Sequence, residues 1–432
     1  MSEPSPDATR AVSVAFRTLG CKVNHVESED IAADLIGRGA RLSGEDEAAV
    51  VVINTCTVTG EADAKARKAV RHALKAAAEP LVVVTGCLAS VDRASLEALD
   101  ERVVVEPDKS RVAELVAKRL GLDSGPRGHE VRAGADFHTR AMLKVEDGCD
   151  NFCSYCIVPY ARGVPRGVAL GEAEAEASAL VSAGVREIVL TGINIGRYRD
   201  QASGADLAAL VTAIAGTGIE RLRLSSIEPP DLTREFLAAI AAVPAFCPHL
   251  HVPLQSGSDA VLAAMGRHYT AEQFAAFIGD ARDALPHLAV TTDVIAGFPG
   301  ETAAQADDTL ALCEEIGFAK LHVFRYSERA GTPAAAMPGQ VAPATKSERA
   351  AALRRTGDAL RARYLAGRVG GEARVLIERG RAISDSGARI ALGTSEDYVR
   401  VRVEGASVST GQVTAVRLLS QDATGLVGKP LE

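Results

Sequence analysis

The sequence predicts an α/β protein of three parts: an N-terminal open parallel α/β domain, a central partial (β/α)6 barrel and a small C-terminal β-barrel. In residues 12–120, short apolar runs alternate with alanine-rich helical stretches, as in a parallel sheet. Six further apolar runs, most of them separated by helical stretches, follow between residues 141 and 324. Beyond residue 370 the pattern changes to short alternating runs between Gly and Ser turns, which is typical of a small β-barrel.

Composition and charge exclude several classes of protein. The chain has 432 residues, of which 47% are hydrophobic and 24% charged, as expected for a globular protein of two or three domains. Its net charge of -8 argues against nucleic-acid binding over the whole surface, and no apolar run is long enough to span a membrane. The polar start of the chain lacks an apolar signal core, so we expect a disordered lead over residues 1–11 and a cytoplasmic protein. In a reducing compartment, the eight cysteines are ligands or catalysts more often than disulfides.

The N-terminal domain, residues 12–122, contains three predicted strands that are each followed by a cysteine. Strands are predicted over 12–19, 50–53 and 81–84, and helical stretches over 28–38, 63–78 and 94–99. Cys21, Cys56 and Cys87 stand just beyond the three strand ends. Because the carboxyl ends of parallel strands meet at one edge of a sheet, we expect these thiols to converge there. They could hold a three-thiolate cluster, and the alternative is three small core residues, since free cysteines are often buried.

The central domain, residues 137–368, follows a Gly/Pro-rich linker over residues 123–136. Its strands are predicted over 141–145, 187–190, 221–224, 249–252, 290–295 and 321–324, with helical stretches such as 171–184 and 271–284 between them. Six βα units of this kind fit a parallel, partly open barrel. Barrels of this sort place their chemistry at the carboxyl ends of the strands.

A second cysteine group stands directly after the first of these strands. Cys149, Cys153 and Cys156 have the spacing C-x3-C-x2-C. Three thiolates would leave one iron of a four-iron cluster free for a small ligand. A zinc site or three buried cysteines are the alternatives, but zinc motifs prefer paired C-x2-C spacings, and no second pair is present. The spacing resembles the signature of the radical S-adenosylmethionine (SAM) superfamily, which implies that the open iron chelates the amino and carboxylate groups of SAM.

Three short motifs extend the resemblance to one branch of that superfamily. Residues 19–24 (LGCKVN), 54–59 (NTCTVT) and 85–87 (TGC) resemble the N-terminal domain of the radical SAM methylthiotransferases. The first two are most similar to the branch that acts on N6-threonylcarbamoyladenosine in tRNA, and the resemblance covers nearly the whole chain. It implies two 4Fe-4S clusters: a SAM-cleaving cluster on Cys149, Cys153 and Cys156, and an auxiliary cluster on Cys21, Cys56 and Cys87.

The reaction that the resemblance implies is the conversion of N6-threonylcarbamoyladenosine at tRNA position 37 to its 2-methylthio derivative. Two SAM molecules are used per turnover. One yields the 5′-deoxyadenosyl radical that removes hydrogen from C2, and the other methylates the sulfur that the auxiliary cluster carries. No side chain is expected to act as catalytic acid or base, because an unactivated aromatic C–H bond requires cofactor chemistry. The implied partners are the tRNA anticodon loop, an electron donor and a sulfur source.

Three alternatives remain open at the level of sequence. They are an isopentenyladenosine tRNA methylthiotransferase, a ribosomal-protein aspartate methylthiotransferase, and a non-catalytic iron–sulfur protein that binds RNA. The motifs LGCKVN and NTCTVT favour the threonylcarbamoyl branch over the first two. The intact C-x3-C-x2-C motif, with a full set of barrel strands, argues against the third.

Polar residues at the strand ends of the barrel are the predicted SAM contacts. Residues 191–194 resemble the family segment that faces the SAM amino group, Glu228 could accept hydrogen bonds from SAM, and Arg267 could pair with a carboxylate. Taken singly, Glu228 or Asp293 could instead cap a helix, and His251 could be a core histidine. The predicted set is Thr191, Gly192, Asn194, Glu228, His251, Gln255, Arg267, Asp293, Gly297 and Tyr326.

Two regions are predicted to contact RNA. A basic helical stretch over residues 346–368 is usually a solvated helix face, but in an acidic chain it is also the best local candidate for phosphate contacts. Residues 369–432 resemble the TRAM domain, an RNA-binding module in this family, although residues 371–432 hold eight basic and eight acidic side chains. The predicted contacts in the helix are Lys346, Arg349, Arg354, Arg355, Arg361 and Arg363.

Overall fold

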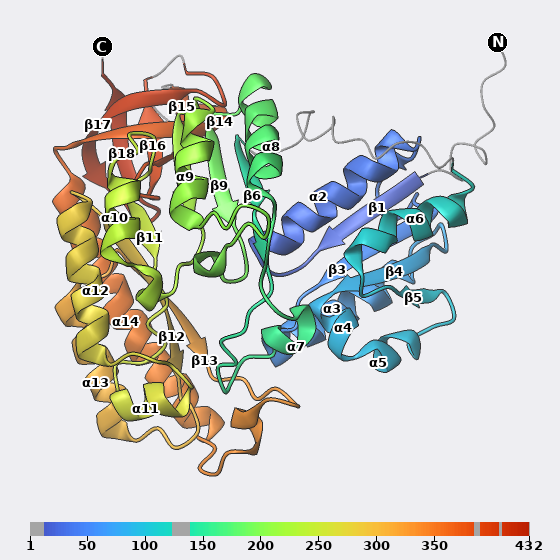
Figure 1. Ribbon diagram of the computed structural model, residues 1–432, viewed down its shortest axis with the longest axis horizontal. Helices are drawn as coiled ribbons and strands as arrows, with labels where there is room; N and C mark the ends of the chain where they lie inside the picture. The colour runs from blue at the N-terminus through green and yellow to red at the C-terminus, as the bar shows by residue number, and fades with distance from the viewer. Residues whose placement is uncertain (1–12, 123–138, 384–388, 406–407, 432) are drawn as a thin grey trace.

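The computed structural model describes residues 13–122, 139–383, 389–405 and 408–431 (Figure 1). The predicted lead (1–11) and the predicted linker (123–136) lie outside these residues. Among the described residues, no helix is long and apolar enough to cross a membrane. The predicted three-part α/β fold is confirmed.

The N-terminal domain is a five-stranded parallel sheet with helices on both faces. Its strands, in spatial order, are β2 (Arg41–Leu42), β1 (Ser13–Thr18), β3 (Val50–Thr55), β4 (Leu81–Gly86) and β5 (Val103–Val105). One face is covered by α2 (Lys22–Gly37) and α6 (Lys109–Leu120), and the other by α3 (Gly60–Ala73), α4 (Cys87–Val91) and α5 (Arg93–Glu97). Every residue of β3 is buried, which explains its unbroken apolar pattern.

Helix α2 begins earlier than the sequence predicts. Predicted from Ser28, it starts at Lys22, because Cys21 is its extended N-cap residue (φ -85°, ψ 172°). The first cysteine therefore stands at the amino end of a long helix, where the backbone N–H groups carry partial positive charge.

The central domain is a partial barrel made of two three-stranded parallel sheets. One sheet has the order β10-β9-β6 and the other β11-β12-β13. Isolated parallel bridges, such as Ser226 with His251, join β10 to β11 and make the curve continuous. The strands are β6 (Arg140–Lys144), β9 (Glu187–Thr191), β10 (Arg221–Leu224), β11 (His249–His251), β12 (Ala289–Ala296) and β13 (Lys320–Arg325).

Helices cover the outer side of this curved sheet (Figure 1). They include α8 (Leu170–Ser182), α9 (Leu207–Gly216), α10 (Arg234–Ala241), α12 (Ala271–Ala284), α13 (Ala303–Ile316) and α14 (Pro343–Arg368). Short segments complete the domain: β7 (Glu146–Asp147), α7 (Val158–Arg162), β8 (Arg166–Gly167) and α11 (Asp259–Ala264). The predicted basic stretch is the long helix α14, which packs on β13.

The C-terminal domain is a closed barrel with strand order β14-β15-β16-β18-β17. Its strands are β14 (Glu372–Ile383), β15 (Arg389–Ser395), β16 (Arg400–Glu404), β17 (Val413–Gln421) and β18 (Leu426–Pro430). The sequence predicts strands only over 374–378, 397–403 and 412–419, which correspond to β14, β16 and β17. Glycines and a proline in β15 and β18 resemble turn residues, and pairing within the barrel overrides that local preference.

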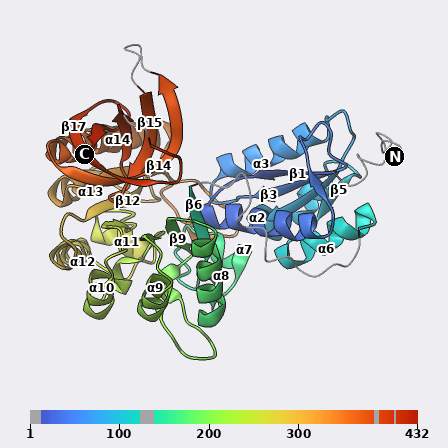
Figure 2. The same cartoon turned by 90° about the horizontal axis from the view of Figure 1, so that it is seen from above.

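The C-terminal barrel lies against the central domain (Figure 2), and two buried arginines near the amino ends of the central strands fix it there. Arg221 donates to the backbone carbonyl oxygens of Arg374 at 2.8 Å and Ser395 at 2.9 Å. Arg223 donates to the carbonyl oxygen of Glu396 at 3.0 Å. Both pair with the buried Glu187, which compensates their desolvation.

Candidate active site

The three N-terminal cysteines converge as the strand pattern predicts. Cys21, Cys56 and Cys87 follow β1, β3 and β4 at the carboxyl edge of the sheet. A side chain at Gly20 would place its Cβ 2.5 Å from the Cβ of Cys56, so glycine is what allows the two segments to approach. Burial raises the pKa of the Cys56 thiol, and the charges of Cys87 and Cys21 raise it further. The three sulfurs are thus close enough to interact, and a bound metal would be needed to hold them as thiolates.

The second cysteine triplet lies in the loop between β7 and α7. The backbone N–H of Cys156 donates to the carbonyl oxygen of Cys153 at 2.9 Å, and Phe152 has a φ of 44° where the loop folds back. Burial raises the pKa of Cys156 to about 12, with Cys153 and Cys149 adding to the effect. Within the described ranges, no three His, Cys, Asp or Glu side chains surround a single ion position.

Side-chain N–H groups point at sulfurs of both triplets. Arg162 Nε lies 3.2 Å from Cys87 Sγ, and Arg267 donates to Cys153 Sγ at 3.5 Å. The amide of Asn194 donates to Cys149 Sγ at 3.7 Å. Hydrogen bonds to cluster sulfurs tune the reduction potential of a cluster, so these donors suit an iron–sulfur site.

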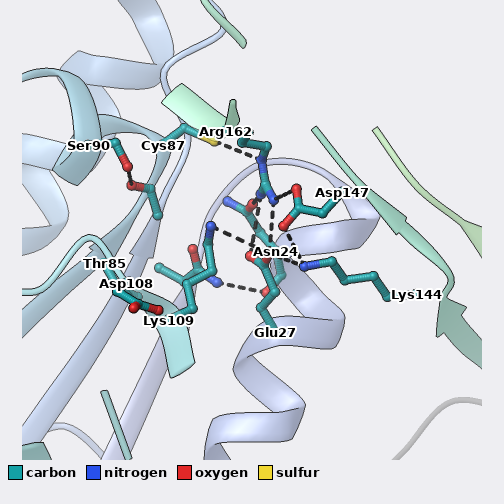
Figure 3. A network of polar contacts seen from close by, with 12 residues as sticks. Asn24, Glu27, Thr85, Cys87, Ser90, Asp108, Lys109, Lys144, Asp147 and Arg162 are labelled. Carbon is teal, nitrogen blue, oxygen red and sulfur yellow. Dashed lines mark hydrogen bonds and ion pairs between the residues drawn. The ribbon is translucent and has the colours of Figure 1, made fainter. Parts of the chain in front are cut away.

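Arg162 links Cys87 of the first triplet to Asp147, which lies just before the loop of the second triplet (Figure 3). It belongs to α7, which packs against α4 of the N-terminal domain, and its side chain is almost fully buried. Besides Cys87, its guanidinium donates to Asn24 at 2.6 Å, to Glu27 at 2.9 Å and to Asp147 at 2.7 Å. This side chain therefore makes hydrogen bonds to both the N-terminal domain and the segment that carries the second triplet.

The carboxylates around Arg162 remain ionised. Burial raises the pKa of Glu27, but Arg162, Lys144 and Lys109 outweigh it and lower the value overall. Burial likewise opposes ionisation of Asp147, yet Arg162 and Lys144 hold its pKa at about 2. The result is a charge-compensated polar contact across the domain interface.

Two predicted SAM contacts, Glu228 and Arg267, lie beside Cys153. All three line a cavity of about 150 Å³ together with Tyr269. Arg267 pairs with Glu228 through both of its terminal nitrogens, and its guanidinium lies 5.0 Å from the centre of the Tyr269 ring. The side chain of Glu228 makes no helix-capping hydrogen bond, so the capping alternative is excluded.

The predicted residues after β9 lie next to a carboxyl that the sequence reasoning missed. Asn194 contacts Cys149, and its backbone N–H donates to Glu146 Oε2 at 2.8 Å. At Gly192, an added Cβ would lie 2.7 Å from that oxygen. Burial raises the pKa of Glu146 to about 7. The sequence signal that could have identified Glu146 is its position as an acidic residue directly before the cysteine loop. Thr191 is buried at the end of β9 and pairs with Lys144 of β6.

The other predicted cofactor contacts lie apart from the cavity beside Cys153. His251 and Asp293 contact each other at 3.3 Å within a larger cavity described below. Gln255 is buried with a φ of 67° and exchanges backbone hydrogen bonds with β12. Gly297 lies against Lys346, and Tyr326 packs on Phe298 in a cluster that includes Met265 and Tyr155.

Of the predicted RNA contacts on α14, two contact other side chains of the protein, and the others are exposed or line a cavity. The ammonium of Lys346 lies 4.7 Å above the Tyr326 ring, and Arg349 pairs with the buried Glu301 at 2.7 Å. These two therefore have structural roles. Arg354, Arg355 and Arg363 are exposed, and Arg361 lines the larger cavity.

Comparisons with known proteins place the chain among known enzymes. Residues 143–313 match the model of the Radical SAM superfamily, and residues 13–106 match that of the Uncharacterized protein family UPF0004. The threonylcarbamoyladenosine tRNA methylthiotransferase MtaB of Bacillus subtilis is 37% identical, with 94% of each chain covered. The tRNA-2-methylthio-N(6)-dimethylallyladenosine synthase of a Parafrankia species is 36% identical over 93% of this chain and 85% of its own length.

Among solved structures, the radical SAM methyltransferase TsrM of Kitasatospora setae superposes with a TM-score of 0.56 at 15% identity. It covers 75% of this chain and 77% of its own, which supports the fold alone. The two relatives decide the family, since each is at least 36% identical along more than 90% of this chain and is named as a tRNA methylthiotransferase or a tRNA-2-methylthio synthase. The chain therefore belongs to the radical SAM methylthiotransferase family.

Proposed function

We propose that this protein converts N6-threonylcarbamoyladenosine at position 37 of tRNA to its 2-methylthio derivative. The observation that carries the substrate is the 37% identity to the Bacillus subtilis MtaB along 94% of both chains. As a radical SAM methylthiotransferase, the chain uses SAM and 4Fe-4S clusters. An electron donor and a sulfur source are the required partners, and a tRNA substrate favours a cytoplasmic location.

The two cysteine triplets are the proposed cluster ligands. Cys149, Cys153 and Cys156 would hold the SAM-cleaving cluster, and the strand-end triplet the auxiliary one. When bound, these groups supply the radical and the sulfur for attack at C2 of the adenine. The residues of the chain would orient them. Arg162 donates to Cys87 and to Asp147 just before the second triplet, and Glu228 and Arg267 offer opposite charges that could bind the amino and carboxylate ends of SAM.

Nucleoside mass spectrometry of tRNA tests this function. A strain deleted for the gene should lose 2-methylthio-N6-threonylcarbamoyladenosine and accumulate its precursor. The wild-type gene should restore it, and Cys87→Ala or Cys156→Ala should not. Cys313→Ala is the matched control, because Cys313 is buried in α13 and belongs to neither triplet. It should restore the nucleoside.

The isopentenyl-type substrate is the second candidate, because a full-length relative carries the dimethylallyladenosine name at nearly the same identity. If the deletion strain kept methylthio-threonylcarbamoyladenosine and lost methylthio-isopentenyladenosine, the proposed substrate would be wrong and the family would stand. If no tRNA nucleoside changed, the ribosomal-protein aspartate would become the substrate to examine.

A further inference from the structure

A cavity of about 700 Å³ lies where all three domains meet. Lys22 comes from the N-terminal domain, His251 and Asp293 come from the inner face of the central barrel, and Tyr398 and Arg400 come from the C-terminal barrel. Each domain thus contributes to one open cavity. It is large enough for a modified nucleoside and is distinct from the small cavity beside Cys153.

The acidic groups of this cavity are already paired. Asp293 contacts His251 at 3.3 Å, Glu378 pairs with Arg140, and Asp397 pairs with Arg368 at 2.8 Å. Four lining cations make no ion pair with any residue that the structure describes: Lys22, Lys320, Arg361 and Arg400. The cavity therefore has an excess of unpaired positive charge, which favours an anionic ligand.

Lys22 differs from the other three cations in position and burial. It directly follows the proposed cluster ligand Cys21 and is the first residue of α2. It is partly buried, and its ammonium lies 5.6 Å from the centre of the Tyr398 ring. No carboxylate among the described residues pairs with it, so a bound anion would compensate the cost of burying this charge.

We infer that Lys22 binds the carboxylate on the N6 substituent of the substrate adenine. This inference rests on the proposed function, in which C2 of the base must reach the cluster that Cys21 helps to hold. A substituent on the same base then lies near the residue next to Cys21. Lys320 and Arg400 are exposed, and Arg361 is half-buried, so they suit the RNA phosphates around the flipped nucleotide.

Equilibrium binding to anticodon stem-loops tests the assignment, using the reconstituted full chain. Three loops are compared: one with N6-threonylcarbamoyladenosine, one with the methyl ester of the same group, and one with plain adenosine. The wild type should prefer the free carboxylate over the ester by about tenfold to a hundredfold, the range expected for a charged hydrogen bond. Lys22→Met should abolish that preference, and Lys22→Arg should restore part of it.

Two comparisons keep the result interpretable. Affinity for the plain adenosine loop should be the same in the wild type and in Lys22→Met, which also shows that the variant is folded. Lys65→Met is the matched control, because Lys65 is an exposed residue that pairs with Glu61 on α3. It should keep the carboxylate preference. Arg400→Gln should weaken binding of all three loops alike, since phosphate contacts carry no information about the base.

The outcomes separate this inference from the proposed function. If Lys22→Met kept the full preference of the wild type for the carboxylate, the assignment of Lys22 would be wrong while the substrate would stand. If the wild type bound the methyl ester as tightly as the carboxylate loop, this inference would fail while the substrate would stand. If it bound the plain adenosine loop as tightly as the carboxylate loop, the proposed substrate would fail as well.

Discussion

Glu146 is a buried carboxyl whose pKa is raised to about 7, because burial outweighs the hydrogen bond from the Asn194 backbone. Its Oε1 atom has no hydrogen-bond partner among the described residues. A carboxyl with this pKa changes charge near neutral pH, directly beside the loop that holds Cys149. Its ionisation therefore affects stability in the range where the enzyme works.

Glu146→Gln should make the protein less sensitive to pH. The folded-state pKa of Glu146 lies above the ordinary value, so its stabilising contribution is complete below about pH 4 and is lost as pH rises through 7. Gln keeps an oxygen that can accept the Asn194 hydrogen bond but carries no charge. At pH 8 the variant should be more stable than the wild type by about 2–3 kcal/mol, and the difference should shrink towards pH 5.

Urea unfolding at pH 5, 6, 7 and 8 measures this difference. Glu172→Gln is a suitable control, because Glu172 is exposed on α8 and should change the pH profile little. If the stability of the wild type and of Glu146→Gln depended on pH in the same way, the pKa of the Glu146 carboxyl would not lie near 7 and the prediction would be wrong.

Among individual residues, the six proposed cluster ligands could be predicted because cysteine chemistry leaves few alternatives at those spacings. Glu146 and Arg162 could not, since a lone acidic or basic residue carries no spacing signal. The pairing of Glu228 with Arg267 was also hidden, because they are far apart in the sequence and meet only through the curvature of the barrel.

Helix α7 is the element that connects the cysteine loop to the N-terminal domain. It is only five residues long, yet it contributes the buried Arg162 to four acceptors, among them Cys87 and Glu27. A short helix has little stability of its own, so its position depends on these contacts.

Replacing Arg162 with Gln should loosen the contact between the N-terminal domain and the barrel. Glu27 and Asp147 would lose their main buried cationic partner, which costs about 3–5 kcal/mol when a buried pair is broken. Urea unfolding and limited proteolysis measure the change. Arg166→Gln is the matched control on the same segment, because Arg166 is exposed, and it should shift stability by less than about 0.5 kcal/mol.

The reduction potential of the auxiliary cluster provides a second measurement for the same residue. Arg162→Gln removes the N–H donor to Cys87 Sγ together with its positive charge. Because that charge stabilises the reduced, more negative form of the cluster, its removal should lower the midpoint potential. An unchanged potential together with wild-type stability would contradict the role given to α7.

At the level of elements, the sequence predicts the strands of the two α/β domains well, because buried parallel strands have continuous apolar runs. It fails for short edge strands such as β2 and for β15 and β18 of the C-terminal barrel. In those strands, neighbouring pairs and not local composition determine the structure.

At the scale of the whole molecule, the three domains form one site. Arg162 joins the N-terminal domain to the barrel, and Arg221 and Arg223 join the C-terminal barrel to the amino end of the central strands. The cavity at Lys22 exists only because all three domains are held together. No pattern in the sequence predicts this cavity, since the residues that line it come from distant parts of the chain.

The most direct test of the proposed function is a reaction with purified components. Reconstituted protein, SAM, a strong reductant and a sulfide source are incubated with an anticodon stem-loop that carries N6-threonylcarbamoyladenosine, and the nucleosides are analysed by mass spectrometry. We predict that the 2-methylthio nucleoside forms only with the carboxylate-bearing loop and only when SAM is present. Cleavage of SAM to 5′-deoxyadenosine without any methylthiolated nucleoside, or methylthiolation of an isopentenyl loop alone, would contradict the account.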